Sequence, residues 1–168
     1  MSTIEVPDTQ YADRVRASFA RHAFMDHLGA HLTRVEPGRC EVAAAHRPQL
    51  TQQHGYFHGG VMASLADSAA GYAAYSLIPA DATVLTVEYK LNILRPGQGQ
   101  RLVARARVVK PGRTLTVVQA DVFAVDGGRE TLCLTSLQTL MRLDGQPDDA
   151  RRAESATRSA DVAASPRG

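Results

Sequence analysis

The sequence QQHGYFHGGVMASLADSAAGYAAYSL occupies residues 52–77, and the rest of the chain is organised around it. Its first nine residues are rich in glycine and histidine, which predicts a loop. From Gly59 to Leu77 nearly every side chain is small or apolar, and a helix that is apolar almost all round is a buried helix. Pro79 cannot continue it. We therefore expect a central buried helix over residues 59–77.

A narrow polar stripe interrupts this helix. The spacing i, i+3, i+4, i+7 and i+11 places five residues on one helical face: Ser64, Asp67, Ser68, Gly71 and Tyr75. The first turn of a helix carries unpaired N–H groups and a partial positive charge, and glycine lets a ligand approach that backbone closely. Gly59 and Gly60 are therefore candidates for holding a developing oxyanion, and Asp67 is a candidate base or nucleophile.

These features also have structural alternatives. Two glycines before a helix form an ordinary turn, and a buried Asp67 can be a hydrogen-bonded structural carboxylate. His54 and His58 have the i, i+4 spacing of helical metal ligands, but nearby glycines disfavour a helix there and no third ligand is obvious. Ser64 and Ser68 lack the sequence context of a serine nucleophile. We expect no metal and no cofactor.

Composition limits the class of protein. The chain has 168 residues and a net charge of +2 with both signs mixed, which indicates one domain and no nucleic-acid partner. Cys40 and Cys133 form no CxxC motif and are interpreted as small buried hydrophobic residues in a reducing compartment. No apolar run resembles a signal peptide or a membrane span. The expected location is the cytoplasm, with no membrane partner.

The other segments predict one more helix and several strands. Residues 11–28 have helical spacing with an acidic start, which predicts an N-terminal helix lying across a surface. Period-two patterns and turn signals predict six strands, at residues 29–35, 39–46, 83–94, 101–110, 114–125 and 130–143. The last four are expected to form an antiparallel meander. Residues 144–168 are predicted to be a disordered tail after a domain of residues 1–143.

An antiparallel sheet can bury such a helix only by curling around it, which predicts an α+β fold with a long curved sheet wrapped around residues 59–77. This organisation resembles the hotdog fold. The motif HGYFHGG at 54–60, followed by SLAD at 64–67, is similar to the signature of hotdog acyl-CoA thioesterases of the phenylacetate-degradation and 4-hydroxybenzoyl-CoA type. TVEYKLNILRP at 86–96 and KPGR at 110–113 resemble later segments of that family, so the resemblance covers residues 25–142.

The resemblance implies hydrolysis of an acyl-CoA thioester to a free acid and coenzyme A. By position, Gly59 and Gly60 match the amides that polarise the thioester carbonyl. Asp67 matches the acid that acts as nucleophile or as base for water. Gln52 matches a residue that holds substrate or water near the carbonyl.

Further residues are expected to bind the substrate. His58 is expected to order the loop, and Tyr56 and Phe57 either line an acyl pocket or pack the loop. Basic side chains at strand ends are candidates for the phosphates of coenzyme A. The remaining candidate binding residues are Ser68, Asn92, Arg95, Lys110 and Arg113.

The spacing of the candidate groups predicts a second copy of the chain. Gly60 and Asp67 are separated by about 10 Å of helix at about 1.5 Å per residue. A carbonyl oxygen and its attacked carbon each need a partner within about 3 Å. One helix cannot serve both ends of one substrate, so we expect a homodimer, or a dimer of dimers forming a homotetramer. The family's paired arrangement of subunits is similar.

Two other functions remain open. A non-catalytic acyl-CoA-binding or regulatory module would bind the ester without turnover. Gly71 favours this alternative, because the family often has Thr or Ser at this place, and Ser68 or Ser64 would have to position the water instead. A hydroxyacyl-thioester dehydratase is less favoured, since such enzymes usually have an Asp and His pair at a different spacing.

Overall fold

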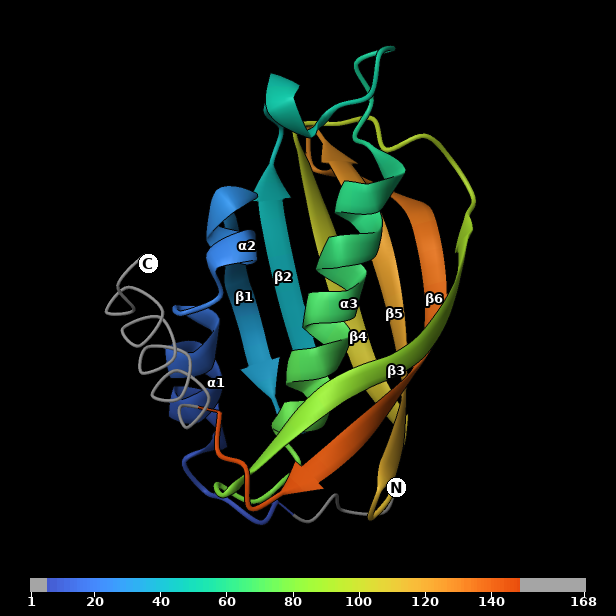
Figure 1. The fold of residues 1–168 in the computed structure, drawn as a ribbon. Coiled ribbons are helices and arrows are strands. Elements are labelled where there is room, and N and C mark those ends of the chain that lie inside the picture. The colour runs from blue at the N-terminus through green and yellow to red at the C-terminus, as the bar shows by residue number, and fades with distance from the viewer. Residues whose placement is uncertain (1–5, 149–168) are drawn as a thin grey trace, which may run out of the picture.

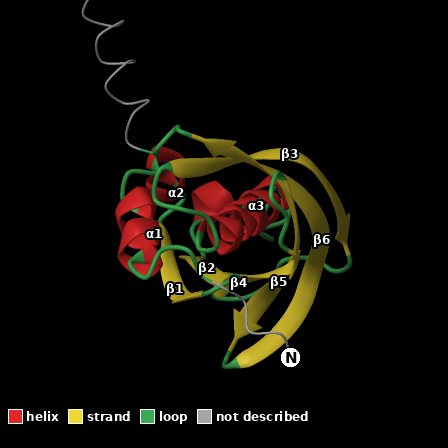
Figure 2. Ribbon diagram, turned by 90° about the horizontal axis from the view of Figure 1, so that it is seen from below, coloured by secondary structure: helices red, strands yellow, loops and turns green. Residues whose placement is uncertain are grey.

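The computed structural model describes residues 6–148, and one antiparallel sheet curls around a central helix, α3 (Gly59–Tyr75). Figures 1 and 2 show α3 enclosed by the concave face of the sheet. This arrangement confirms the predicted hotdog fold. The strands are β1 (Ala30–Glu36), β2 (Arg39–Ala45), β3 (Ala82–Ile93), β4 (Arg101–Lys110), β5 (Leu115–Asp126) and β6 (Arg129–Asp144). The other helices are α1 (Tyr11–Phe19), α2 (Ala23–His27) and the 3-10 turn η1 (Pro48–Leu50).

The inward face of α3 consists mostly of alanine, which allows the helix to lie close to the sheet. Leu65, Ala69, Ala70 and Ala73 are each 0% exposed. Most of the polar stripe is partly accessible, since Ser64, Asp67 and Gly71 are only half-buried, while Ser68 and Tyr75 are buried. The buried helix is confirmed, and its polar face lies where the sheet does not fully cover it.

The N-terminal segment differs from the prediction of one helix over residues 11–28. It forms α1 and α2, with a break at residues 20–22. At about 100° per residue, a straight helix would turn Leu28 about 140° away from Val15. Both side chains are buried, at 5% and 0% exposure respectively. The break lets each short helix present its own apolar residues to the interior.

The predicted meander of the last four strands is wrong in one connection. The strand order is β1-β2-β4-β5-β6-β3, so β3 pairs with β6 rather than with β4. Residues 94–100 cross the end of the barrel beside the start of α3 (Figure 1). The Phe57 N–H donates to the Gly97 carbonyl at 2.9 Å. A Cβ at Gly97 would lie 3.0 Å from Phe57 Cβ, so the crossing segment packs directly on the core.

A β-bulge in β3 changes which residues share a face. The pairing with β6 shifts between Thr86 and Glu88. With strict alternation along β3, Thr86 and Tyr89 would lie on opposite faces of the sheet. In the structure Thr86 pairs with the buried Leu140, and Tyr89 pairs with the buried Gln138. Directly paired residues lie on the same face of a sheet. The bulge therefore turns Thr86 toward α3, on the same face as Tyr89.

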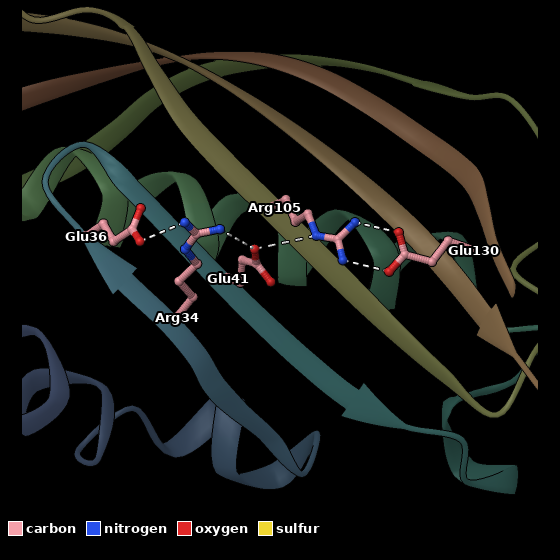
Figure 3. Close-up of polar contacts among 5 residues, drawn as sticks. All are labelled: Arg34, Glu36, Glu41, Arg105 and Glu130. Atoms are coloured by element: carbon pink, nitrogen blue, oxygen red, sulfur yellow. Dashed lines mark hydrogen bonds and ion pairs between the residues drawn. The ribbon is translucent and has the colours of Figure 1, made fainter. Parts of the chain in front are cut away.

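The outer face of the sheet carries a ladder of ion pairs (Figure 3). Arg34 contacts Glu36 at 2.7 Å and Glu41 at 3.7 Å, and Arg105 contacts Glu41 at 3.5 Å and Glu130 at 2.6 Å. The hydrogen bond from Arg105 lowers the pKa of Glu130 below its usual value. A hollow of about 370 Å³ lies on this face, lined by Arg34, Glu41 and Arg105 among others. Glu41 in this hollow is paired with both Arg34 and Arg105, so its carboxylate is not a free base.

Two expectations concern the chain end and the thiols. Asp144 is the last residue of β6, and Asp148 accepts a hydrogen bond from Arg21 at 2.7 Å. The first five residues of the predicted tail are thus placed, and the rest of that prediction, residues 149–168, lies outside the described residues. Cys40 and Cys133 are free and buried, as the sequence indicates. Burial raises the pKa of the Cys40 thiol to about 12.

Candidate functional site

The loop before α3 ends in a histidine cap. His58 is the N-cap residue, and its Nδ1 accepts the Gly60 N–H at 2.9 Å. The His58 carbonyl accepts the Val61 N–H at 3.0 Å. The N–H of Gly59, the first helical residue, donates to no group within residues 6–148. Of the two predicted oxyanion donors, Gly60 is engaged by the cap and Gly59 is available.

The cap gives a stability prediction. Replacing His58 with Ala removes the acceptor for the Gly60 N–H, and losing an N-cap side chain typically costs about 0.5–2 kcal/mol. We expect His58→Ala to lower the free energy of unfolding by about 1 kcal/mol, measured by urea denaturation. His58→Asn supplies another capping acceptor and should recover most of the loss. Equal stability of the Ala variant and the native protein would contradict this role.

The carboxylate of Asp67 lies on the half-buried face of α3. Thr86 Oγ1 donates to Asp67 Oδ1 at 2.8 Å. Within the described residues this is its one polar contact, and no Lys or Arg pairs with it. Asp67 is therefore held in orientation with its second oxygen free, which differs from a carboxylate locked in a salt bridge.

Sequence reasoning did not identify Thr86. It lies outside α3, and strict alternation along β3 puts it on the face away from the helix. The bulge after Thr86 reverses that assignment, and bulges commonly redirect side chains beside active sites. The one signal in the sequence is a threonine in a strand that also belongs to the family-like segment 86–96.

A cavity of about 340 Å³ opens beside Asp67, between α1, α3 and β3. It provides space for part of a small ligand next to the free carboxylate oxygen. The residues that line it are Ser18, His22, Asp67, Ser68, Gly71, Tyr72, Tyr75, Thr83, Val84, Leu85, Thr86 and Asp148.

The two serines proposed to replace a hydroxyl at Gly71 differ in their surroundings. Ser64 Oγ donates to the Gly60 carbonyl at 2.7 Å, so its proton is already used. Ser68 is 8% exposed and lines the cavity together with Asp67. Ser68 is the hydroxyl better placed to contact a water or substrate beside Asp67.

Gln52 and Phe57, two of the loop residues predicted to contact the substrate, make contacts that stabilise the loop before α3. Gln52 Oε1 accepts the His54 N–H, and the Gln52 N–H donates to the Tyr56 carbonyl at 2.9 Å. Phe57 is 2% exposed, and its ring packs edge-on against His46 with centroids 5.2 Å apart. Of the two alternatives for Phe57, packing of the loop is the one that the structure shows. Tyr56 is half-buried in the same loop.

The polar residues predicted to bind coenzyme A lie in two places. Asn92 accepts from Lys90 at 2.9 Å, and Arg95 donates to the Leu132 carbonyl at 3.1 Å. Asn92 and Arg95 are close to Ile93, which contacts the start of α3. Lys110 is the last residue of β4, about 30 Å from Arg101 at the start of that strand, at about 3.3 Å per residue. Arg113 lies in the turn after Lys110. One chain does not bring all four to one site.

Two other kinds of feature are absent from residues 6–148. No three His, Cys, Asp or Glu side chains gather as metal ligands in residues 6–148. No helix in that part of the chain is both long enough and apolar enough to cross a bilayer.

Comparisons with known proteins agree with this fold. Residues 54–131 match the family model described as the thioesterase superfamily. The crystal structure of a thioesterase family protein from Silicibacter pomeroyi is 50% identical, with a TM-score of 0.79, over 80% of this chain and 99% of that chain. The PaaI protein of E. coli, from the phenylacetic acid degradation operon, is 22% identical with a TM-score of 0.74 over 84% and 99% of the two chains, a likeness of fold.

A relative with a named activity is also similar. The 1,4-dihydroxy-2-naphthoyl-CoA hydrolase of Listeria monocytogenes is 29% identical over 108 residues, which are 64% of this chain and 86% of the relative. The range of the family model, residues 54–131, includes the loop before α3, the helix itself and strands β3, β4 and β5.

Proposed function

Because this chain belongs to the thioesterase superfamily and is a thioester hydrolase, we propose that its substrates are acyl-CoA thioesters, hydrolysed with Asp67 as the reactive carboxylate. The single observation that carries this proposal is the state of Asp67. Its carboxylate is held by Thr86 at 2.8 Å, lacks a cationic partner among the described residues, and borders a cavity. A structural carboxylate would be expected to have a salt bridge or several hydrogen bonds.

The proposed reaction follows from these contacts. A water held by the free Asp67 oxygen attacks the carbonyl carbon and gives its proton to the carboxylate. The carbonyl oxygen becomes an oxyanion, which the Gly59 N–H stabilises. The carbon–sulfur bond then breaks, and the departing thiolate takes the proton from Asp67. The products are a carboxylic acid and coenzyme A thiol.

Direct attack by Asp67 on the carbonyl carbon is the second form of this mechanism. It would pass through an acyl anhydride of Asp67, which water then hydrolyses to the same products. Ser68 is the hydroxyl that lies beside Asp67 in the cavity. We assign it the positioning of water, in place of the hydroxyl absent at Gly71.

The distance between Gly59 and Asp67 supports a site shared by two copies. Eight residues separate them on one helix, or about 12 Å at about 1.5 Å per residue. Strand β3 is a twelve-residue edge of the sheet. Val87 and Tyr89 on this edge are each 50% exposed. A long, apolar, exposed edge strand favours pairing with another chain, so a second copy along β3 is proposed to supply the Gly59 amide.

This dimer leads to a test in solution. Sedimentation equilibrium of the native protein is expected to give twice the mass of one chain, or four times for a dimer of dimers. The double variant Val87→Lys, Tyr89→Lys places positive charges opposite each other across the paired edges, so it should produce monomers. If the site is shared, the monomers should lose at least about 10²-fold in hydrolysis, since each lacks an oxyanion donor. A fully active monomer would refute the shared site.

The substrate class is tested by thiol release. Wild-type protein is offered short, medium, long and aromatic acyl-CoA esters, and free coenzyme A is followed with a thiol reagent. Saturable release from at least one class is the expected result. Binding of these esters without thiol release would support the non-catalytic alternative. Hydration of enoyl esters without thiol release would instead support the dehydratase.

A further inference from the structure

The cavity beside Asp67 ends in polar groups from a distant part of the chain. Ser18 on α1 and His22, just after α1, line it together with residues of α3. Ser18 Oγ and the Tyr72 hydroxyl are 3.2 Å apart. The Tyr72 and His22 rings lie 6.4 Å apart between centroids. Figure 2 shows α1 and α2 together beside α3, at the side where the sheet leaves the central helix uncovered.

These three residues, the polar cluster of Ser18, His22 and Tyr72, have unused hydrogen-bonding capacity. Two hydroxyl groups that share one hydrogen bond leave one O–H free to donate. His22 Nδ1 is buried and has no partner within residues 6–148. Leaving a buried polar atom unpaired is unfavourable, so these atoms are suited to a ligand that completes their hydrogen bonds. Burial raises the pKa of Tyr72 to about 12, so its hydroxyl stays protonated at neutral pH.

The charges around the cavity disfavour an anionic group. Asp67 and Asp148 both line it, and no Lys or Arg does so among the described residues. Arg21 lies 2.7 Å from Asp148 and is already engaged with it. A carboxylate at the far end of an acyl group would therefore meet like charge without a free cation. A neutral polar group meets no such penalty.

The positions of Asp67 and Tyr72 along the axis of α3 relate the polar cluster to the reaction. Tyr72 follows Asp67 by five residues, about 7.5 Å along α3 at about 1.5 Å per residue. An extended chain advances about 1.2 Å per bond. We propose that Ser18, His22 and Tyr72 select acyl groups that carry a neutral hydrogen-bonding substituent about six bonds from the thioester carbonyl. This inference rests on the proposed function, because it places the acyl group in the cavity beside Asp67.

The test compares three esters of one chain length: hexanoyl-CoA, 6-hydroxyhexanoyl-CoA and adipoyl-CoA. Their affinities are measured by calorimetry on Asp67→Asn, so that binding does not depend on turnover. We expect the hydroxy ester to bind about three- to tenfold more tightly than hexanoyl-CoA. Adipoyl-CoA should bind more weakly than hexanoyl-CoA even without the Asp67 charge, because its terminal carboxylate loses water in the cavity and meets no free cation there among the described residues. In the Asp67→Asn background, Tyr72→Phe or Ser18→Ala should reduce the preference for the hydroxyl toward one.

A matched control is Tyr11→Phe, which removes a tyrosine hydroxyl from α1 at a residue that does not line the cavity. It should keep the native preference between the two neutral esters. Equal binding of these two esters by the parent, or a preference that survives Tyr72→Phe and Ser18→Ala, would overturn the inference. Failure of the proposed function is seen separately, as no thiol release by the wild-type protein from any ester. The binding preference remains measurable in that case.

Discussion

Replacing Asp67 with Asn is expected to lower kcat for thioester hydrolysis by at least about 10²-fold, the usual range for a lost general base being about 10²–10⁴. Asparagine has nearly the same shape as aspartate and keeps a carbonyl oxygen. That oxygen can accept the hydrogen bond that Thr86 Oγ1 donates to Asp67 Oδ1 at 2.8 Å in the native protein. It cannot take a proton from water or attack the carbonyl as a carboxylate does. The measurement is thiol release under saturating substrate, with Asp67→Ala as a second variant.

The control for this prediction is Thr86→Val, which keeps the side-chain shape and removes the hydroxyl. It leaves the Asp67 carboxylate in place but removes the hydrogen bond from Thr86, so a smaller loss of about tenfold is expected. Circular dichroism and sedimentation should match the native protein for each variant. An Asp67→Asn enzyme that retains more than a tenth of the native kcat would exclude Asp67 as base and as nucleophile.

Removing the Gly59 N–H should produce a loss of similar size, about 10²–10³-fold in kcat, as for other oxyanion donors. Proline removes this N–H and is tolerated at the first position of a helix. The residue before a proline must be extended, and His58 already is, with φ −63° and ψ 141°. A Cβ at Gly59 would lie 2.8 Å from Ile93 Cδ1, so Ile93→Val is introduced with it to remove that methyl group.

The matched variant is Gly59→Ala with the same Ile93→Val change. It adds a Cβ and keeps the N–H, so it separates the effect of side-chain bulk from the loss of the donor. We expect the alanine double variant to retain most of the native kcat and the proline double variant to lose it. Similar rates for the two double variants would assign the oxyanion contact elsewhere. Thermal unfolding of both reports whether α3 still begins normally.

The amino-acid sequence predicted the central features of the site because they depend on neighbouring residues. The alanine-rich helix, the Gly59-Gly60 start and the position of Asp67 all follow from a local pattern with helical period. Strand locations followed from the same reasoning, and β4 was predicted with its observed ends. The role of His58 in ordering the loop is consistent with its observed N-cap hydrogen bond.

The sequence could not predict contacts that depend on which strands meet. The bond from Thr86 to Asp67 requires a bulge in β3, and that bulge exists only because β3 pairs with β6. The break between α1 and α2 similarly depends on tertiary packing, because both Val15 and Leu28 must point into the protein interior. The local periodicity of the sequence contains no information on the bulge in β3 or on the break between α1 and α2.

The sequence by itself determined a buried helix with one acidic residue on a polar stripe and strands long enough to wrap around it, because hydrophobic periodicity is set by adjacent residues. Only the tertiary structure decided that β3 is the sheet edge and that Ser18 and His22 reach the cavity of Asp67. It also decided that, within residues 6–148, the Gly60 amide is bonded and the Gly59 amide is not. These contacts join residues far apart in the chain, and their geometry results from packing of the whole sheet around α3.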